Sequence, residues 1–171
     1  MRIVAGKFAG RDLTSPNDFR VRPTAERVRA AMLDLLTPHL ADARVLDLFA
    51  GTGALGLEAL SRGAKSADFV ETRPSSLHAL RANVAALRLR ERTRIFKRDA
   101  LPFADALTTA AYDVAFVDPP YDSRMLDRVI ETWQRTSFSR LLIAEHSKDH
   151  VLPPGQRRQS FDDTAITIYE V

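Results

Sequence analysis

Apolar runs alternate with stretches of helical periodicity from residue 44 to residue 145 of this 171-residue chain. The apolar runs predict five buried strands, over residues 45–50, 67–71, 94–97, 113–118 and 141–145. The periodic stretches between them predict helices over residues 54–61, 75–87 and 125–135. Strands that alternate with helices form βαβ units, so we expect an α/β domain whose mostly parallel sheet is covered on both faces.

The C-terminal end departs from this alternation. Residues 156–161 and 165–170 flank the turn sequence Asp162-Asp163-Thr164 and predict an antiparallel hairpin on the edge of the sheet.

The N-terminal end departs from it as well. Weak alternation over residues 1–13 predicts a short hairpin, and a helix follows that Thr24 caps and Pro38 ends. We therefore expect two parts, a small N-terminal extension over residues 1–40 and a main domain over residues 41–171.

The sequence contains no cysteine. This excludes a disulfide scaffold, a thiolate zinc site and a cysteine nucleophile. The four histidines have no metal-ligand spacing, so we expect no metal. No stretch approaches the ~20 apolar residues that span a bilayer, and the N-terminus lacks the apolar run of a signal peptide. We expect a cytoplasmic protein without a membrane segment.

A glycine-rich loop joins the first predicted strand of the main domain to its helix. Gly51, Gly53 and Gly56 satisfy the pattern G-x-G-x-x-G, and Glu71 ends the next strand, twenty residues after Gly51. This spacing fits a dinucleotide-binding site, so an NAD-dependent oxidoreductase is one interpretation.

Asp47 argues against NAD. It lies four residues before Gly51, and a pyrophosphate held by the loop would be repelled by a carboxylate. S-adenosylmethionine has no phosphate and carries a positive ammonium and a positive sulfonium, which suit a carboxylate beside a bare glycine turn. Glu71 is then expected to accept the ribose hydroxyls. Asp99, just past the third strand, is expected to accept from the adenine amine or to cap the next helix.

The most specific motif is Asp118-Pro119-Pro120-Tyr121, directly after the apolar run 114–117. In open α/β sheets, ligands bind at the carboxyl ends of the strands, where Asp118 is expected. Two acceptors, the Asp118 carboxylate and the Pro119 carbonyl, suit the two hydrogens of an exocyclic amine on a planar base. Tyr121 offers a flat face on which that base can stack. The motif therefore predicts an N-methyltransferase.

The missing cysteine sharpens this interpretation, because methylation at pyrimidine C5 usually needs a cysteine adduct. Two alternatives remain open beside NAD chemistry. A DNA adenine-N6 methyltransferase uses similar Asp-Pro-Pro-Tyr chemistry, and a non-catalytic RNA-binding assembly factor can retain the cofactor fold.

Two basic blocks suggest a polyanionic partner. Residues 1–30 carry seven Lys and Arg against three acids, and residues 81–98 carry seven against one, although the net charge is only +3. We expect the N-terminal block to make most of the contacts with such a partner, because much of the second block lies at the opposite rim of the sheet. Glu145 ends the fifth strand and is expected to be structural or solvated.

The chain resembles the RsmD-type 16S ribosomal RNA guanine-N2 methyltransferases, a branch of the class I S-adenosylmethionine-dependent enzymes with a Rossmann-like fold. The resemblance extends from residue 2 to about 146, and its most specific part is the run DLFAGTGALGLEALSRG at residues 47–63. It also includes these features: residues 2–6, Gly10-Arg11, Arg22-Pro23-Thr24, Arg27, Val28, Glu71, Asn83 and residues 118–121.

The resemblance implies a seven-stranded sheet, an RNA-contacting N-terminal extension and a small-subunit rRNA guanine as target. It places the cofactor against one set of residues: Asp47, Phe49, Gly51, Thr52, Gly53, Glu71, Thr72, Asp99 and Ala100. It places the guanine at Asp118, Pro119 and Tyr121. The RNA is expected near four residues of the extension, Arg11, Arg20, Arg22 and Thr24. We expect a monomer.

Overall fold

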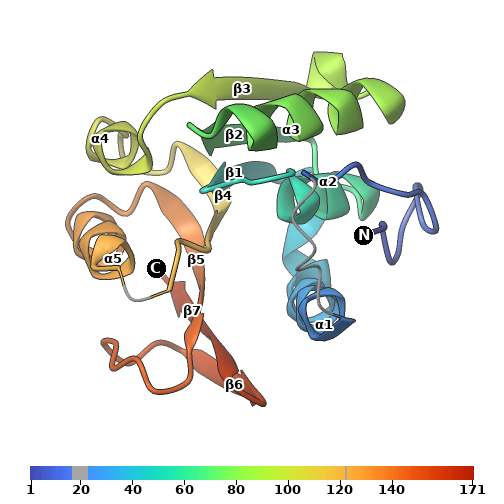
Figure 1. Cartoon of the computed structure of the whole chain (residues 1–171). Coiled ribbons are helices and arrows are strands. Elements are labelled where there is room, and N and C mark those ends of the chain that lie inside the picture. The colour runs from blue at the N-terminus through green and yellow to red at the C-terminus, as the bar shows by residue number, and fades with distance from the viewer. Residues whose placement is uncertain (17–22, 122) are drawn as a thin grey trace.

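Seven strands make up one sheet in the computed structural model, which describes residues 1–16, 23–121 and 123–171, with only the backbone at residues 23–25. The strands are β1 (Arg44–Leu48), β2 (Ser66–Glu71), β3 (Thr93–Lys97), β4 (Tyr112–Val117), β5 (Ser139–Ser147), β6 (Arg157–Phe161) and β7 (Thr164–Glu170). Their order is β3-β2-β1-β4-β5-β7-β6 (Figure 1). Strands β1 to β5 are parallel, whereas β7 is antiparallel to both β5 and β6.

The predicted α/β class, mostly parallel sheet and C-terminal hairpin are confirmed, and the strand boundaries differ from prediction by one or two residues. The helices are α1 (Pro23–Leu40), α2 (Ala54–Ser61), α3 (Pro74–Ala86), α4 (Ala100–Asp105) and α5 (Met125–Thr136), with a 3₁₀ turn η1 (Arg90–Arg92). Strand β7 lies inside the sheet and β6 forms its edge.

Both predicted ends of the first helix were wrong. Helix α1 begins at Pro23, so Thr24 lies within its first turn and does not precede it. Proline suits this position because the first helical N–H groups have no intrahelical acceptor. Pro38 lies inside the last turn, and the helix continues to Leu40. Leu36 and Leu40 are almost completely buried, and their packing holds this turn in place despite the missing N–H donor of Pro38.

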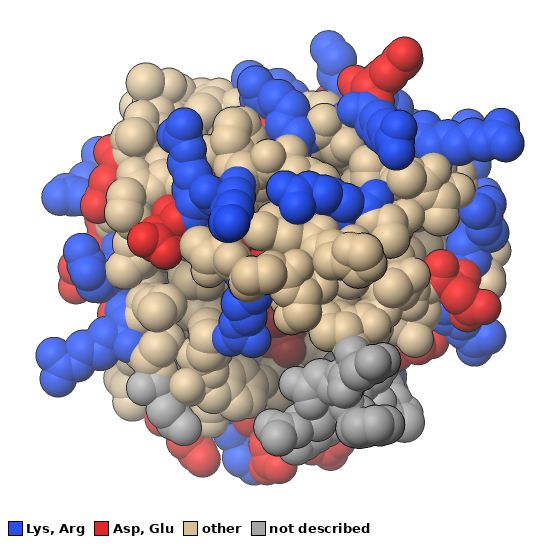
Figure 2. Space-filling view, turned by 45° about the horizontal axis from the view of Figure 1, so that its top comes forward, with Lys and Arg blue, Asp and Glu red and all other residues tan. Residues whose placement is uncertain are grey.

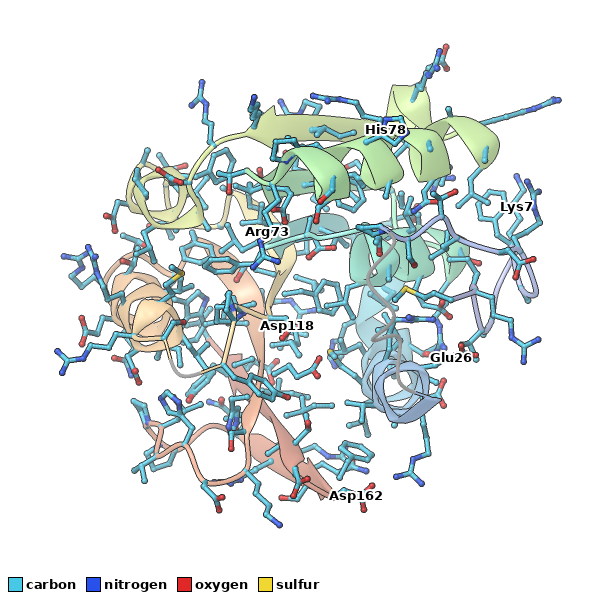
Figure 3. The ribbon with its side chains drawn as sticks, in the orientation of Figure 1. Lys7, Glu26, Arg73, His78, Asp118 and Asp162 are labelled. Carbon is cyan, nitrogen blue, oxygen red and sulfur yellow. The ribbon has the colours of Figure 1, made fainter. Side chains whose placement is uncertain are left out.

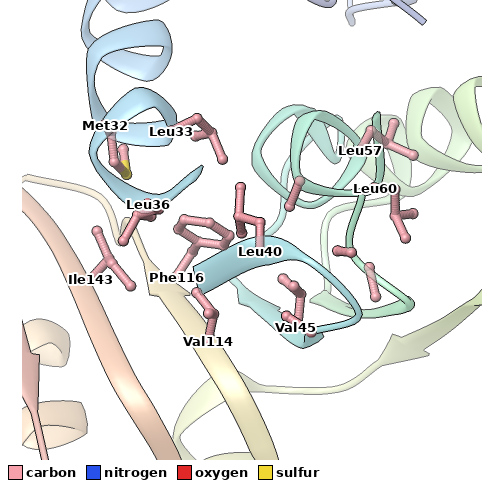
Figure 4. Packing of buried hydrophobic residues seen from close by; sticks show 14 of the residues in the cluster. Met32, Leu33, Leu36, Leu40, Val45, Leu57, Leu60, Val114, Phe116 and Ile143 are labelled. Carbon is pink, nitrogen blue, oxygen red and sulfur yellow. The ribbon is translucent and has the colours of Figure 1, made fainter. Parts of the chain in front are cut away.

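Alternate residues of the central strands face two different helical layers. Val45 of β1 belongs to a hydrophobic cluster with α1, α2 and α3, whereas Leu46 and Leu48 pack with α4 and α5. Figure 4 shows the first cluster, where Leu36 and Phe116 meet between α1 and β4. Each fully buried large apolar side chain contributes about 1.5–3 kcal/mol. These two layers leave the carboxyl ends of β1, β2 and β4 together at one edge.

The N-terminal residues form an antiparallel pairing, as predicted, but it is a single bridge between Arg2 and Asp12 rather than two full strands. The amide of Ile3 donates to Arg11, and that of Leu13 donates to Met1. Ile3 and Leu13 are buried in the same cluster as α1 and β1. The division at residue 40 stays a prediction.

Gly6 fixes the approach of this segment to α2. Its φ is +86°, and a Cβ there would overlap the Ser61 carbonyl oxygen, which accepts a hydrogen bond from the Lys7 amide at 2.8 Å. Gly10 has a similar φ of +82° but open space around it.

We expect Gly6→Ala to lower the free energy of unfolding by about 2–4 kcal/mol, because backbone strain and steric overlap act together. The matched control Gly10→Ala is expected to cost only the strain, about 1–2 kcal/mol. Urea unfolding of both variants measures the difference. Equal losses would show that the close contact with Ser61 contributes nothing.

Candidate active site

The glycine loop between β1 and α2 has its amides already hydrogen-bonded within the protein. The Gly51 amide donates to Glu71 Oε2 at 2.8 Å, the Gly53 amide to the Ala50 carbonyl at 2.8 Å, and the Gly56 amide to Asp47 Oδ2 at 3.0 Å. In a dinucleotide-binding loop, amides of this kind point at the pyrophosphate. In this chain, oxygen atoms of the protein accept these hydrogen bonds, in the place that a pyrophosphate would take.

Glu71 lies at the end of β2 and closes over this loop. Its Oε1 accepts from the amides of Thr72 at 3.0 Å and Arg73 at 2.9 Å, while Oε2 accepts from Gly51. Three amides therefore fix the carboxylate, which still has lone pairs for a ligand because each oxygen can accept more than one hydrogen bond.

Asn83 of α3 ties the loop to the N-terminal segment. Its Nδ2 donates to the carbonyls of Thr52 and Thr14, each at 3.0 Å, and its Oδ1 accepts from the Thr14 amide. Asn83 is buried, so these bonds are shielded from water and position the loop.

Asp47 lies beneath the loop and is only 2% exposed. Burial raises its pKa well above the usual value, against the opposing effect of the Gly56 amide. The odd-numbered position of Asp47 in β1 turns it toward α2, on the same side as Val45.

The Asp-Pro-Pro-Tyr turn follows β4 directly. Asp118 is partly buried and Pro119 is buried, whereas Tyr121 is 51% exposed. The hydroxyls of Tyr121 and Thr164 are 2.8 Å apart, which links the turn to β7. Ser123 donates to the Pro120 carbonyl at 2.8 Å and holds the turn from the other side.

One cavity of about 870 Å³ joins the glycine loop to this turn. Among its lining are nine of the predicted site residues: Phe49, Gly51, Glu71, Thr72, Asp99, Ala100, Asp118, Pro119 and Tyr121. Asp47, Thr52 and Gly53 do not line it. Phe49 has a left-handed φ of 60°, a backbone strain that is typical of functional sites. The structure thus brings most of the predicted cofactor and base contacts into one space.

Carboxyl groups lie deep in this cavity. Burial raises the pKa of Asp118 to about 6, and burial together with the charge of Asp118 raises the pKa of Glu145 to about 8. Figure 3 shows Asp118 and Arg73 at the same edge of the sheet. In Figure 2 acidic atoms lie at the bottom of a shaded recess, with a Lys or Arg side chain directly beside it and others above it.

Comparisons with known proteins identify the family of this chain. A family model described as conserved hypothetical protein 95 matches residues 1–162. Ribosomal RNA small subunit methyltransferase D of Escherichia coli strain K12 is 35% identical over 90% of this chain and 78% of the relative. The enzyme of the same name from Haemophilus influenzae is 32% identical over 100% of this chain and 92% of the relative. The chain belongs to the RsmD family of ribosomal RNA methyltransferases.

Solved structures place the RsmD fold in a wider class. The structure of yhhF from Escherichia coli has a TM-score of 0.86 and 32% identity, covering 99% of this chain and 97% of that one. The Thermus thermophilus 16S rRNA N2 G1207 methyltransferase, solved with AdoMet and guanosine, has a TM-score of 0.68. It is 20% identical over 90% of this chain and 44% of its own, which shows a shared fold alone. The predicted class I methyltransferase fold is confirmed.

The predicted RNA contacts of this RsmD-family chain lie away from the cavity or outside the described residues. The guanidinium of Arg11 donates to the Ala86 carbonyl at the end of α3, at 3.0 Å. Arg20 and Arg22 are outside the described residues, and of Thr24 only the backbone in α1 is described.

Sequence reasoning missed several residues of the cavity wall. Arg73, Arg128 and Glu145 line it, as does Arg98 at the end of the basic block 81–98. Glu145 was expected to be structural or solvated, but it is partly buried beside Asp118. The strand order could have identified Glu145, because this residue lies near the carboxyl end of β5, the strand that pairs with β4.

Within residues 1–16, 23–121 and 123–171, no group of three or more His, Asp or Glu side chains is arranged to hold a metal ion. In the same part of the chain, no helix is both long enough and apolar enough to cross a bilayer.

Proposed function

We propose that this chain transfers a methyl group from S-adenosylmethionine to the exocyclic N2 amine of a guanine in small-subunit (16S) ribosomal RNA. The observation that carries the proposal is the shared cavity, in which Asp118 and Pro119 face the same space as Gly51 and Glu71. This arrangement sets a base-holding turn beside a cofactor-holding loop.

The residues of the loop fit S-adenosylmethionine better than NAD. The amides of Gly51, Gly53 and Gly56 are occupied by protein acceptors and leave no cradle for a pyrophosphate. Glu71 would accept from the ribose hydroxyls, and the exposed Asp99 from the adenine amine. Asp47 would act from behind the loop, through the Gly56 amide that it holds. When bound, the cofactor supplies an electrophilic methyl group.

Asp118 and Pro119 would prepare the amine. An exocyclic amine is a weak nucleophile because its lone pair is delocalised into the ring. The Asp118 carboxylate and the Pro119 carbonyl each accept one amine hydrogen, which fixes the direction of the lone pair. Asp118 then stabilises the positive charge that develops on nitrogen and takes its proton. Tyr121 stacks on the base, and a paired base must first be flipped out.

The choice of RNA rests on the relatives, whose names specify the small-subunit ribosomal RNA. A protein with this substrate is expected in the cytoplasm, acting as a monomer on rRNA within or outside the subunit. The N-terminal residues 1–40 remain the proposed RNA-contacting extension.

The test is transfer of labelled methyl from S-adenosylmethionine to three substrates: small-subunit particles, naked 16S rRNA and duplex DNA. The proposal expects label in RNA alone, and mapping of the methylated nucleotide should find N2-methylguanine. Label in DNA adenine would favour the DNA methyltransferase alternative. Binding of RNA without any transfer would favour the assembly factor.

The arginines on the cavity wall should also hold RNA. Arg73, Arg98 and Arg128 are exposed around the cavity that contains Asp118. The triple alanine variant is expected to weaken RNA binding, and to reduce the slope of log affinity against log salt by about 2–3, since each lost phosphate contact removes about 0.7–0.9. The double variant Arg88→Ala/Arg90→Ala, near η1, is the control and should keep the slope. Filter binding at several salt concentrations measures both. An equal loss in the control would assign RNA holding to the opposite rim.

A further inference from the structure

Glu145 stands beside Asp118 at the end of the neighbouring strand. Strands β4 and β5 are parallel with Val117 opposite Ala144, so Asp118 and Glu145 are the next residues in the same register. Neighbouring strands are about 4.8 Å apart. The two carboxyl groups therefore reach the same part of the cavity from adjacent strands, and both line it.

Glu145 also lines a second, smaller cavity of about 210 Å³. Pro119, Pro120 and Tyr121 form part of the wall of both cavities, so the Asp-Pro-Pro-Tyr turn and Glu145 mark the place where the two spaces meet. An apolar cavity of about 150 Å³ can hold a benzene ring, and this one is larger. It is large enough for a flat ring that stacks on Tyr121 while its edge faces Glu145.

The Glu145 carboxylate has no hydrogen bond or ion pair with any described residue. Arg29 of α1 is the cation that acts on it, but the Arg29 guanidinium donates to the Arg2 carbonyl and lies 3.9 Å from Glu58. Among the described residues, no donor occupies the Glu145 oxygens, so they are available to accept from a ligand in the cavity.

We propose that Glu145 selects guanine by accepting a hydrogen bond from N1–H of the target base, while Asp118 and Pro119 hold the N2 amine. This assignment rests on the proposed function. Guanine presents two adjacent donors on this edge, N1–H and the N2 amine, which match two adjacent carboxylates. Adenine N1 carries no hydrogen and is itself an acceptor, so it could not donate a hydrogen bond to the Glu145 carboxylate.

The charge state of the pair sets the pH at which Glu145 can act as an acceptor. Asp118 faces Glu145 from β4, its charge also raises the pKa of Asp47 of β1, and Arg29 faces Glu145 from α1. Burial raises the pKa values of both groups, and the charge of Asp118 raises that of Glu145 further, so near neutral pH the pair carries about one negative charge. Glu145 has the higher pKa and holds the proton of the pair near neutral pH, where its O–H can donate to an acceptor at N1. The preference for N1–H therefore belongs to the ionised pair, above about pH 8.

The test replaces the mapped target guanine in the RNA by 2-aminopurine, which keeps the 2-amine but has an acceptor at N1. Above about pH 8, where Glu145 is ionised, wild-type protein should methylate the guanine RNA with a kcat/KM about 5- to 150-fold higher. Glu145→Gln keeps the size of the side chain and adds N–H donors, so it should lose most of this preference. The control Glu91→Gln, at an exposed position of η1, should keep it.

The outcomes separate the two proposals. No methyl transfer by wild-type protein to either RNA would overturn the proposed function, and this assignment with it. Transfer with the same guanine preference in wild type and Glu145→Gln would overturn the assignment alone. Comparing the two RNAs tests the wild-type protein by itself, so equal rates on both would overturn the assignment even if the variant does not fold.

Discussion

We expect Asp118→Ala to lower kcat for methyl transfer by about 10²- to 10⁴-fold, the range contributed by a positioned acid–base group. The alanine loses an acceptor for the amine, the negative charge beside the developing cation, and the proton acceptor. Affinity for S-adenosylmethionine, measured by calorimetry, should change little, because the amides of Gly51, Gly53 and Gly56 bond to other acceptors and Asp118 does not hold the loop.

Asp113→Asn is the matched control for this prediction. Asp113 lies near the opposite end of the same strand, where it pairs with Arg44 at 3.2 Å. Loss of its charge should leave kcat unchanged. A fully active Asp118→Ala protein, or equal losses in both variants, would refute the role assigned to Asp118.

The pH profile provides a second check on Asp118. The carboxyl must be ionised to accept the amine hydrogen, and its pKa is raised to about 6. The rate should therefore fall as the pH drops through about 6 and level off above it. Asp118→Asn keeps one acceptor but cannot titrate, so this step should disappear from its much slower profile.

The strand–helix alternation and the two strand-end motifs were enough to predict the fold and the main walls of the cavity. Residues 47–56 and 118–121 each form a local unit, in which the turn follows directly from glycine, proline and an adjacent buried strand. Their meeting follows from the parallel order of β1 and β4, which short βαβ units favour.

Residues whose roles depend on their neighbours could not be predicted in this way. Glu145 lies beside Asp118 only because β5 pairs with β4 in one register. Asp47 was expected to face the ligand, but the pleat of β1 turns it beneath α2, where it holds the Gly56 amide. Arg73 and Arg128 come from two helical regions whose approach is set by packing, and nothing in their local sequence marks them.

Glu58 is the residue for which we expect the largest loss of stability. It lies on α2 with no exposed surface and accepts hydrogen bonds from the amides of Val4 and Ala5, at 3.0–3.1 Å. Its Oε1 is also 3.2 Å from Arg62, and its Oε2 is 3.9 Å from Arg29. One carboxylate thus neutralises two buried arginines and anchors the N-terminal segment.

Glu58→Ala should lower the free energy of unfolding by about 3–5 kcal/mol, because it leaves buried charges and two amides without their acceptor. Urea unfolding measures the loss, and hydrogen exchange should show faster exchange at the Val4 and Ala5 amides. The control Asp34→Ala removes only the exposed partner of Arg62 and should cost about 0–1 kcal/mol. If the two variants lose equal stability, the buried carboxylate does not anchor the segment. If only Glu58→Ala is destabilised and its Val4 amide exchanges freely, the N-terminal segment depends on α2, the helix that begins at the glycine loop.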